Sequence, residues 1–233
     1  MPGFSELDPA PIRATIERLV RRIEQRFPGS GLLGVAQELV RTADQNEELI
    51  AQLRQPIWWL RLLSVLGALA LIGLVAWAAL QIARMAAQAG NTLSDILQGI
   101  DAAANELIFL SIALFFLVRL EARVKQGRAL RMLHRLRSLA HVVDMHQLTK
   151  DPADALRPVE SAERSVARGP LIRYLDYCSE LLALVSKLAA LHAQHLQDAV
   201  VLEAVGEIES LSSDLSRKIW QKITILSAGQ PER

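Results

Sequence analysis

The sequence has few of the residues that build cross-links, rigid turns and aromatic cores. Its 233 residues include one cysteine, and aromatic residues make up 5 %. The single cysteine, Cys178, excludes an internal disulfide and a cysteine-rich zinc site; it lies on an apolar stripe, and we interpret it as a small hydrophobic residue. Only 12 glycines and 9 prolines occur, whereas Ala, Leu, Arg and Glu are abundant. Because these abundant residues favour helices, we predict an almost entirely helical chain.

Charge is missing from one long stretch. Leu62–Ala83 contains twenty-two residues without a charged side chain. As a helix it would extend roughly 33 Å, against a hydrocarbon core of ~30 Å. Trp58 and Trp59 precede the stretch, at the position where indole rings favour the lipid–water boundary. We therefore predict a first transmembrane helix at about residues 60–83, with the two tryptophans as interfacial anchors.

A second apolar run is shorter. Leu107–Val118 has twelve residues, a length that alone is typical of a buried or re-entrant segment. Extended to residues 102–122, the run is long enough to span a bilayer. Asn105 and Glu106 fall near one end, where polar side chains either reach the headgroups or line a pore. We predict a second transmembrane helix at about 102–122, with Asn105 and Glu106 as candidate polar residues at the membrane.

Lysine and arginine are absent between Met85 and Val118, and a basic cluster follows that segment. Because basic residues favour the cytoplasmic side, we predict a multi-pass protein of the bacterial inner membrane with both termini in the cytoplasm and a short acidic loop outside. Residues 1–30 are dense in charge, so no signal peptide is expected. Candidate contacts for anionic lipid headgroups are Arg119, Arg123, Lys125, Arg128, Arg131 and Arg135.

Amphipathic segments flank the predicted membrane hairpin, which occupies residues 57–122. Apolar residues recur at helical spacing in residues 1–56 and indicate a pair of cytoplasmic helices. Residues 123–148 continue as a basic juxtamembrane helix, and proline and glycine then predict a linker at 149–170. Residues 171–228 predict an antiparallel cytoplasmic hairpin whose apolar stripe is covered by a third helix or by another chain. The predicted fold class is an all-α membrane protein.

Two patterns resemble chemical motifs, and each has a simpler interpretation. Gly29–Gly34 matches G-x-G-x-x-G, but a charged helix rather than a strand precedes it, so we interpret it as a turn between helices. His192 and His195 lie one turn apart with Asp198 following, and residues 141–146 hold a similar group. Neither group supplies a convergent set of metal ligands. Since no catalytic motif is recognised, we expect no enzyme activity, no metal and no cofactor.

Two functions are compatible with this organisation. The first is a non-enzymatic membrane protein whose cytoplasmic helical modules self-associate or bind a helical partner at the bilayer. The second is an oligomeric pore-forming or membrane-disrupting effector, because two membrane helices with helical cytoplasmic regions resemble the layout of two-span bacterial defence effectors. An accessory transporter subunit is disfavoured, since the spans lack buried charges for a substrate. Nucleic acid is not expected as a partner, because the basic cluster adjoins the membrane and lacks stacking aromatics.

Overall fold

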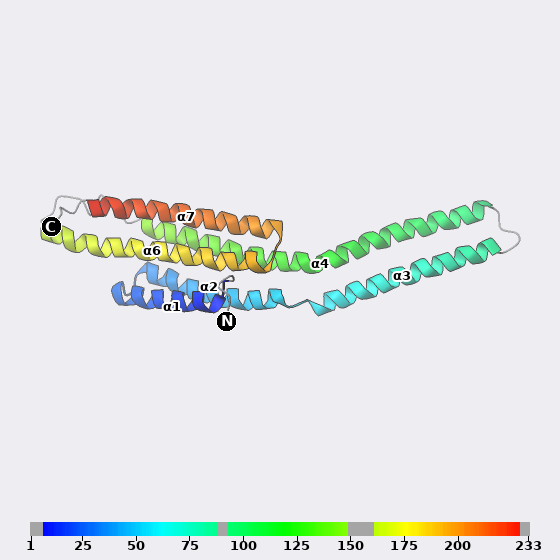
Figure 1. The fold of residues 1–233 in the computed structure, drawn as a ribbon, viewed down its shortest axis with the longest axis horizontal. Helices are drawn as coiled ribbons and strands as arrows, with labels where there is room; N and C mark the ends of the chain where they lie inside the picture. Colours follow the sequence, from blue (N-terminus) through cyan, green and yellow to red (C-terminus); the bar gives the residue numbers. More distant parts are fainter. Residues whose placement is uncertain (1–6, 88–92, 149–160, 229–233) are drawn as a thin grey trace. The chain divides into compact units, whose positions relative to one another are not determined.

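The computed structural model describes residues 7–87, 93–148 and 161–228, and every regular element in these ranges is a helix. The prediction of a helical chain is therefore confirmed for the described residues. Two compact units are present, the bundle unit (1–54 with 126–233) and the apolar unit (55–125). The helices in Figure 1 are α1 (Pro9–Arg26), α2 (Gly31–Arg54), α3 (Trp58–Ala87), α4 (Leu93–Leu148), α6 (Ser161–His195) and α7 (Ala199–Ala228).

The first two helices begin and end where the local sequence favours it. The Asp8 carboxylate caps α1 by accepting the Ala10 N–H at 3.0 Å, and prolines occupy the first turn. Gly29 has a φ of 71°, in the left-handed region where glycine carries no steric penalty. The chain reverses there and enters α2 one residue after Ser30. An interhelical turn is therefore confirmed at Gly29 and Ser30, whereas Gly31–Gly34 already belong to the first turn of α2.

One apolar core joins α1, α2, α6, α7 and the C-terminal part of α4 within the bundle unit. In α4, the stripe predicted from spacing is buried: Leu133, Leu136, Ala140 and Val143 are each at most 2 % exposed. Helices α6 and α7 run side by side in Figure 1, and this part of α4 belongs to the same core. Helices of the same chain thus cover the apolar stripe predicted for residues 171–228.

The bundle unit combines segments that are separate in the sequence. Residues 1–54 and 126–148, predicted as a helix pair and a juxtamembrane helix, share one core with the C-terminal helices. The physical reason is that each short amphipathic helix exposes a stripe that only another helix can cover. Periodicity identifies such a stripe but does not identify its partner.

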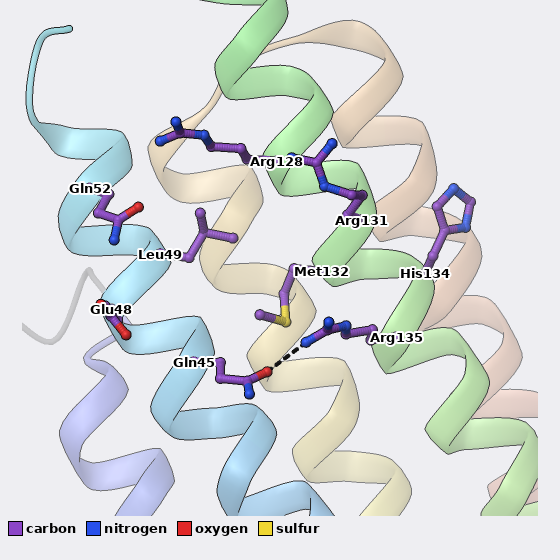
Figure 2. Close-up of a pocket in the computed structure, with 9 residues that line it drawn as sticks. All are labelled: Gln45, Glu48, Leu49, Gln52, Arg128, Arg131, Met132, His134 and Arg135. Carbon is purple, nitrogen blue, oxygen red and sulfur yellow. Dashed lines mark hydrogen bonds between the residues drawn. The ribbon is translucent and has the colours of Figure 1, made fainter.

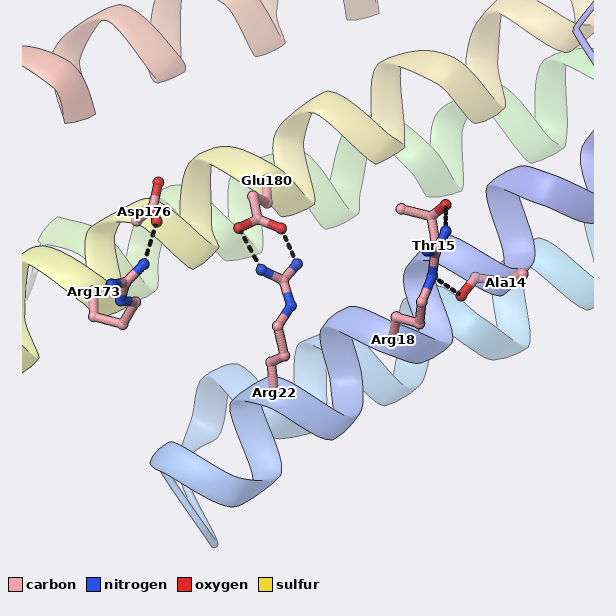
Figure 3. Close-up of polar contacts among 7 residues, drawn as sticks. All are labelled: Ala14, Thr15, Arg18, Arg22, Arg173, Asp176 and Glu180. Atoms are coloured by element: carbon pink, nitrogen blue, oxygen red, sulfur yellow. Dashed lines mark hydrogen bonds and ion pairs between the residues drawn. The ribbon is translucent and has the colours of Figure 1, made fainter.

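Helix α1 is held against α6 by polar and aromatic contacts (Figure 3). Arg22 forms a two-pronged ion pair with Glu180, and its guanidinium also lies 5.5 Å from the centroid of the Tyr177 ring. Phe27 packs edge-on against Tyr174 and Tyr177, with centroid distances of 5.5 and 6.2 Å. The hydrogen bond to Glu180 raises the pKa of Arg22, so this pair stays ionised.

Two boundaries involve proline. Helix α2 ends at Arg54 and α3 begins at Trp58, so the chain breaks around Pro56. The sequence predicts a linker with at most one short helix at 149–170, and in the structure α6 begins at Ser161 and contains Pro170. Proline removes one helical hydrogen bond, but the alanine, glutamate and arginine residues before it favour continuation. Residues 149–160 lie outside the described residues.

The apolar unit consists of α3 and the N-terminal part of α4. Apolar residues surround α3 on all sides, unlike the one-sided stripes of α1 and α2. At Gly67, an added Cβ would lie 3.4 Å from the side chain of Leu117, so the small residue allows the two helices to approach closely. Glu121 of α4 accepts the backbone N–H of Ile57 at 3.2 Å and Arg61 Nε at 3.1 Å.

By length and composition, one helix among the described residues is apolar enough to cross a membrane. The qualifying stretch lies within Gly31–Gln81, and no part of it is buried. Since α2 contributes its stripe to the bundle core, the stretch corresponds to the predicted span in α3. The predicted second span in α4 is not among the qualifying helices of the described ranges. The two-helix membrane hairpin therefore stays a prediction.

Candidate functional site

A groove between α2 and α4 of the bundle unit is the candidate site (Figure 2). It has a volume of about 480 Å³. One wall comes from α2 and the other from the C-terminal part of α4, with Leu49 and Met132 as its apolar lining. The polar and charged lining residues are Gln45, Glu48, Gln52, Arg128, Arg131, His134 and Arg135.

Helical spacing places the arginines of the groove together. Arg128, Arg131 and Arg135 occupy positions i, i+3 and i+7 of α4, which share one face. The stripe of α4 that contains Leu133 and Leu136 faces the core instead. Figure 2 shows Arg128 and Arg135 extending from α4 towards α2. Three of the six residues of the predicted basic cluster therefore belong to one wall of a groove.

Two of the three arginines have no polar partner among the described residues. Arg135 Nη1 donates a hydrogen bond to Gln45 Oε1 at 2.7 Å (Figure 2). Within the part of the chain that the structure describes, neither Arg128 nor Arg131 has a hydrogen bond or ion pair. Glu48 is the one carboxylate among the lining residues, so three guanidinium groups and one carboxylate give a net charge of +2. Unpaired guanidinium groups of this kind bind phosphate or carboxylate oxygens through paired N–H donors.

The α2 wall was not found by sequence reasoning. Gln45, Glu48 and Gln52 lie at i, i+3 and i+7, on a face that the sequence describes only as polar and solvated. They become candidate site residues because they line the same groove as the three arginines of α4. No signal in one sequence shows that α2 lies beside α4, so this half of the groove could not be predicted.

The other predicted lipid-contact residues belong to the apolar unit. Arg119 and Arg123 lie over the rings of Phe115 and Phe116, at 4.8 and 5.9 Å from the ring centroids. Lys125 forms an ion pair within α4 at 3.1 Å. The six basic residues thus divide into three groove arginines in the bundle unit and three cations with intrahelical partners in the apolar unit. Contact with lipid stays a prediction for all six.

The predicted polar and interfacial residues lie in the apolar unit. Asn105 and Glu106 are both exposed on α4. Glu106 lines a cleft of about 450 Å³ between α3 and α4, together with Gln81 and mostly apolar side chains. Trp58 and Trp59 begin α3 and are 72 % and 54 % exposed. All four predicted residues are therefore accessible on the surface of this unit.

A buried polar pair joins α2 to α6. His192 Nε2 and Asn46 Oδ1 are 2.6 Å apart, and Asn46 Nδ2 donates to the Leu188 carbonyl oxygen at 3.3 Å. Burial, with a smaller effect from His195, lowers the pKa of His192 to about 4, so the ring is neutral and its Nε2–H donates to Asn46. Sequence reasoning missed Asn46, although a polar residue in register with the apolar stripe of α2 was the available signal.

Cys178 and His192 are both buried in the core of the bundle unit. Cys178 is fully buried in the apolar core, which agrees with its interpretation as a small hydrophobic residue, and this burial raises the pKa of its thiol to about 12. His192 lies in the core rather than in a ligand set. Across residues 7–87, 93–148 and 161–228, no group of three or more His, Cys, Asp and Glu side chains could hold a metal ion.

Comparison with known proteins adds no further information about the groove. Neither a protein family, a curated protein nor a solved structure matches this sequence. The functional conclusion therefore depends on the burial, charge and contacts of the residues described above.

Proposed function

We propose that this chain is a non-enzymatic protein of the bacterial inner membrane. In this proposal α3 and the N-terminal part of α4 cross the bilayer as a hairpin, and the bundle unit lies in the cytoplasm. There it associates with a second copy or with a helical partner protein. The observation that carries the proposal is the contrast in apolar exposure between the two units.

The bundle unit buries its apolar stripes, whereas α3 exposes its apolar residues. Leu66, Leu69 and Ile72 are 54, 59 and 64 % exposed, in the middle of a helix that is apolar on all sides. A helix of this kind is either buried in a large core or inserted in a membrane. Because none of the apolar stretch is buried by the chain itself, a hydrocarbon solvent is the environment that fits it.

The second span has weaker support than the first. Phe109 and Val118 of α4 are 69 % and 59 % exposed, so this helix also needs an apolar covering. The close approach at Gly67 and the hydrogen bonds from α3 to Glu121 favour insertion of the two helices as a pair. The shortness of the uncharged run is compatible with a span whose end charges extend to the headgroups.

The orientation follows from the distribution of lysine and arginine. The segment between the two predicted spans contains acidic residues and no lysine or arginine. Arginines precede the first span and are frequent after the second. The bias of basic residues towards the cytoplasm supports a cytoplasmic bundle unit and cytoplasmic termini.

Exposed apolar residues of α7 support a role in protein association. Val200, Leu202, Trp220 and Ile225 are 49, 43, 55 and 52 % exposed. Helical spacing places Val200 and Ile225 on one flank of the buried stripe of α7, and Leu202 and Trp220 on the other flank. Large exposed apolar side chains, tryptophan above all, are enriched at protein interfaces. These exposed side chains are separate from the buried apolar stripe of α6 and α7, which other helices of the same chain cover.

Cysteine labelling tests the proposed topology. Ser94→Cys places an exposed thiol in the N-terminal part of α4, and Ser138→Cys places one in the bundle unit. In spheroplasts, a membrane-impermeant maleimide should label S94C at once and S138C only after lysis. The parent chain is the control, because its buried Cys178 has a pKa of about 12 and should stay unlabelled. Equal labelling of both variants in intact spheroplasts would contradict the proposal.

A pore-forming or membrane-disrupting effector is the second candidate. It is favoured by the cleft of the apolar unit, where Gln81 and Glu106 lie among apolar residues. In an oligomer, a ring of such carboxylates would attract cations. This function predicts depolarisation on induced expression, read with a potential-sensitive dye and reduced by Glu106→Ala. Unchanged membrane potential under all inducing conditions would eliminate it.

A further inference from the structure

We propose that the groove between α2 and α4 binds a phosphate monoester, presented by a small molecule or by a lipid headgroup. All lining residues belong to the bundle unit. The inference therefore goes beyond membrane anchoring and does not depend on it. It rests on the charge, the pairing and the dimensions of the groove.

Arg128 and Arg131 differ in their pairing from three arginines of the same unit that face other helices. Arg13 pairs with Asp44, Arg22 with Glu180, and Arg137 with Glu207 at 2.8 Å, so carboxylates of neighbouring helices neutralise them. Arg128 and Arg131 have no such partner among the described residues.

Like charges three residues apart on a helix repel each other. Arg128 and Arg131 have this spacing and together supply two free guanidinium groups at the groove. An anion bound between them would remove the repulsion and satisfy donors that the chain leaves unpaired. The arrangement therefore favours binding of an external anion.

The charge and the donor set favour a phosphate monoester over a single carboxylate. A monoester carries close to two negative charges at neutral pH and offers three acceptor oxygens, which matches the net charge of +2 and two guanidinium groups. Gln45 already orients Arg135 at 2.7 Å. On the α2 wall, Glu48 can accept hydrogen bonds from hydroxyl groups next to the phosphate, as in a glycerol or sugar unit.

The groove is also large enough for such a ligand. Its volume of about 480 Å³ falls in the range of ~300–1,000 Å³ that is usual for small-molecule sites. The apolar lining from Leu49 and Met132 gives a carbon skeleton a surface to contact. A phosphorylated polyol and the headgroup of phosphatidic acid share this chemistry, and the experiment separates the two sources.

Binding measurements on the full chain test the proposal. Glycerol 3-phosphate is titrated into protein in neutral detergent by calorimetry, with glycerol as the control probe. In parallel, the protein is placed in phosphatidylcholine nanodiscs that contain either phosphatidic acid or phosphatidylserine at equal surface charge. Native mass spectrometry then measures which lipid the protein retains. The variants are Arg128→Gln with Arg131→Gln, and the matched control Arg217→Gln with Lys218→Gln, two exposed cations of α7.

We expect R128Q/R131Q to weaken binding of the phosphate-bearing probe at least tenfold and R217Q/K218Q to leave it unchanged. Binding of glycerol 3-phosphate assigns a soluble ligand, and retention of phosphatidic acid alone assigns a headgroup; either supports the proposal. R128K/R131K keeps the charge without the guanidinium fork and should lose part of the affinity while retaining the fold. Absence of binding by both probes, equal losses in the two double variants, or equal retention of phosphatidylserine would overturn it.

Discussion

At the scale of single residues, the buried pair of His192 and Asn46 determines how α2 meets α6. Asn46→Leu should lower the free energy of unfolding by about 1–3 kcal/mol, because the Nε2–H of His192 is left buried without an acceptor. His192→Leu should also destabilise, since it leaves Asn46 Oδ1 unpaired. The double variant should lose less than the sum of the two, because it removes both polar groups. Urea unfolding of the full chain in neutral detergent measures all three, and strictly additive losses would contradict the pairing.

The same histidine predicts a pH dependence. Its pKa is about 4 in the folded chain and near 6.5 when exposed, so the unfolded chain binds more protons between these values. The free energy of unfolding should therefore fall as the pH decreases from about 6.5 towards 4, by roughly 3 kcal/mol once both states are protonated. His192→Leu should remove this contribution. Urea midpoints at pH 7.5, 6 and 5 test it, and identical pH profiles for parent and variant would contradict it.

The residues of the candidate site were predicted in part. Arg128, Arg131 and Arg135 were identifiable because a basic cluster after an apolar run is visible in the sequence. Glu48 and Gln52 were not, because a solvated helix face and a groove wall have the same composition. Asn46 was overlooked although it stands on an apolar stripe. A polar residue whose partner lies on a helix far away in the sequence is marked only by its position relative to the apolar stripe, which is a weak signal.

At the scale of elements, the C-terminal part of α4 is a core helix as well as a basic one. Leu136 is fully buried, whereas Val142 on the same helix is 39 % exposed. Leu136→Ala should lower the free energy of unfolding by about 2–5 kcal/mol, because it leaves a cavity in the shared core. Val142→Ala is the matched control and should change it by about 0.5 kcal/mol or less. If both variants change the free energy of urea unfolding by similarly small amounts, the C-terminal part of α4 is not part of the core. It would then be the juxtamembrane helix predicted from the sequence.

Sequence periodicity predicted the helices better than their partners. The stripes of α1, α4, α6 and α7 and the turn at Gly29 follow from local spacing and turn chemistry. The start of α6 at Ser161 does not follow from local sequence, because Pro170 is typical of a helix boundary whereas the helix continues through it. Which stripe covers which depends on tertiary packing, and that information is spread over the whole chain.

At the scale of the whole molecule, the two units satisfy their apolar residues differently. The bundle unit closes its own core, so the C-terminal helices do not need a second chain to cover their stripe. The apolar unit leaves its large side chains exposed. Any association of copies is thus expected through the exposed apolar residues of α7 or through the predicted membrane helices, and not through the buried stripe of the C-terminal helices.

The depth of the tryptophans in a bilayer tests the central claim most directly. Trp77 lies in α3 and is 59 % exposed, and Trp220 lies in the bundle unit and is 55 % exposed. Single-tryptophan chains, with the other three replaced by phenylalanine, are reconstituted in vesicles whose lipids carry bromine at defined depths along the acyl chains. Membrane insertion of α3 predicts strong quenching of Trp77 by acyl-chain bromine and negligible quenching of Trp220. Unquenched Trp77, or equal quenching of the two, would contradict the account.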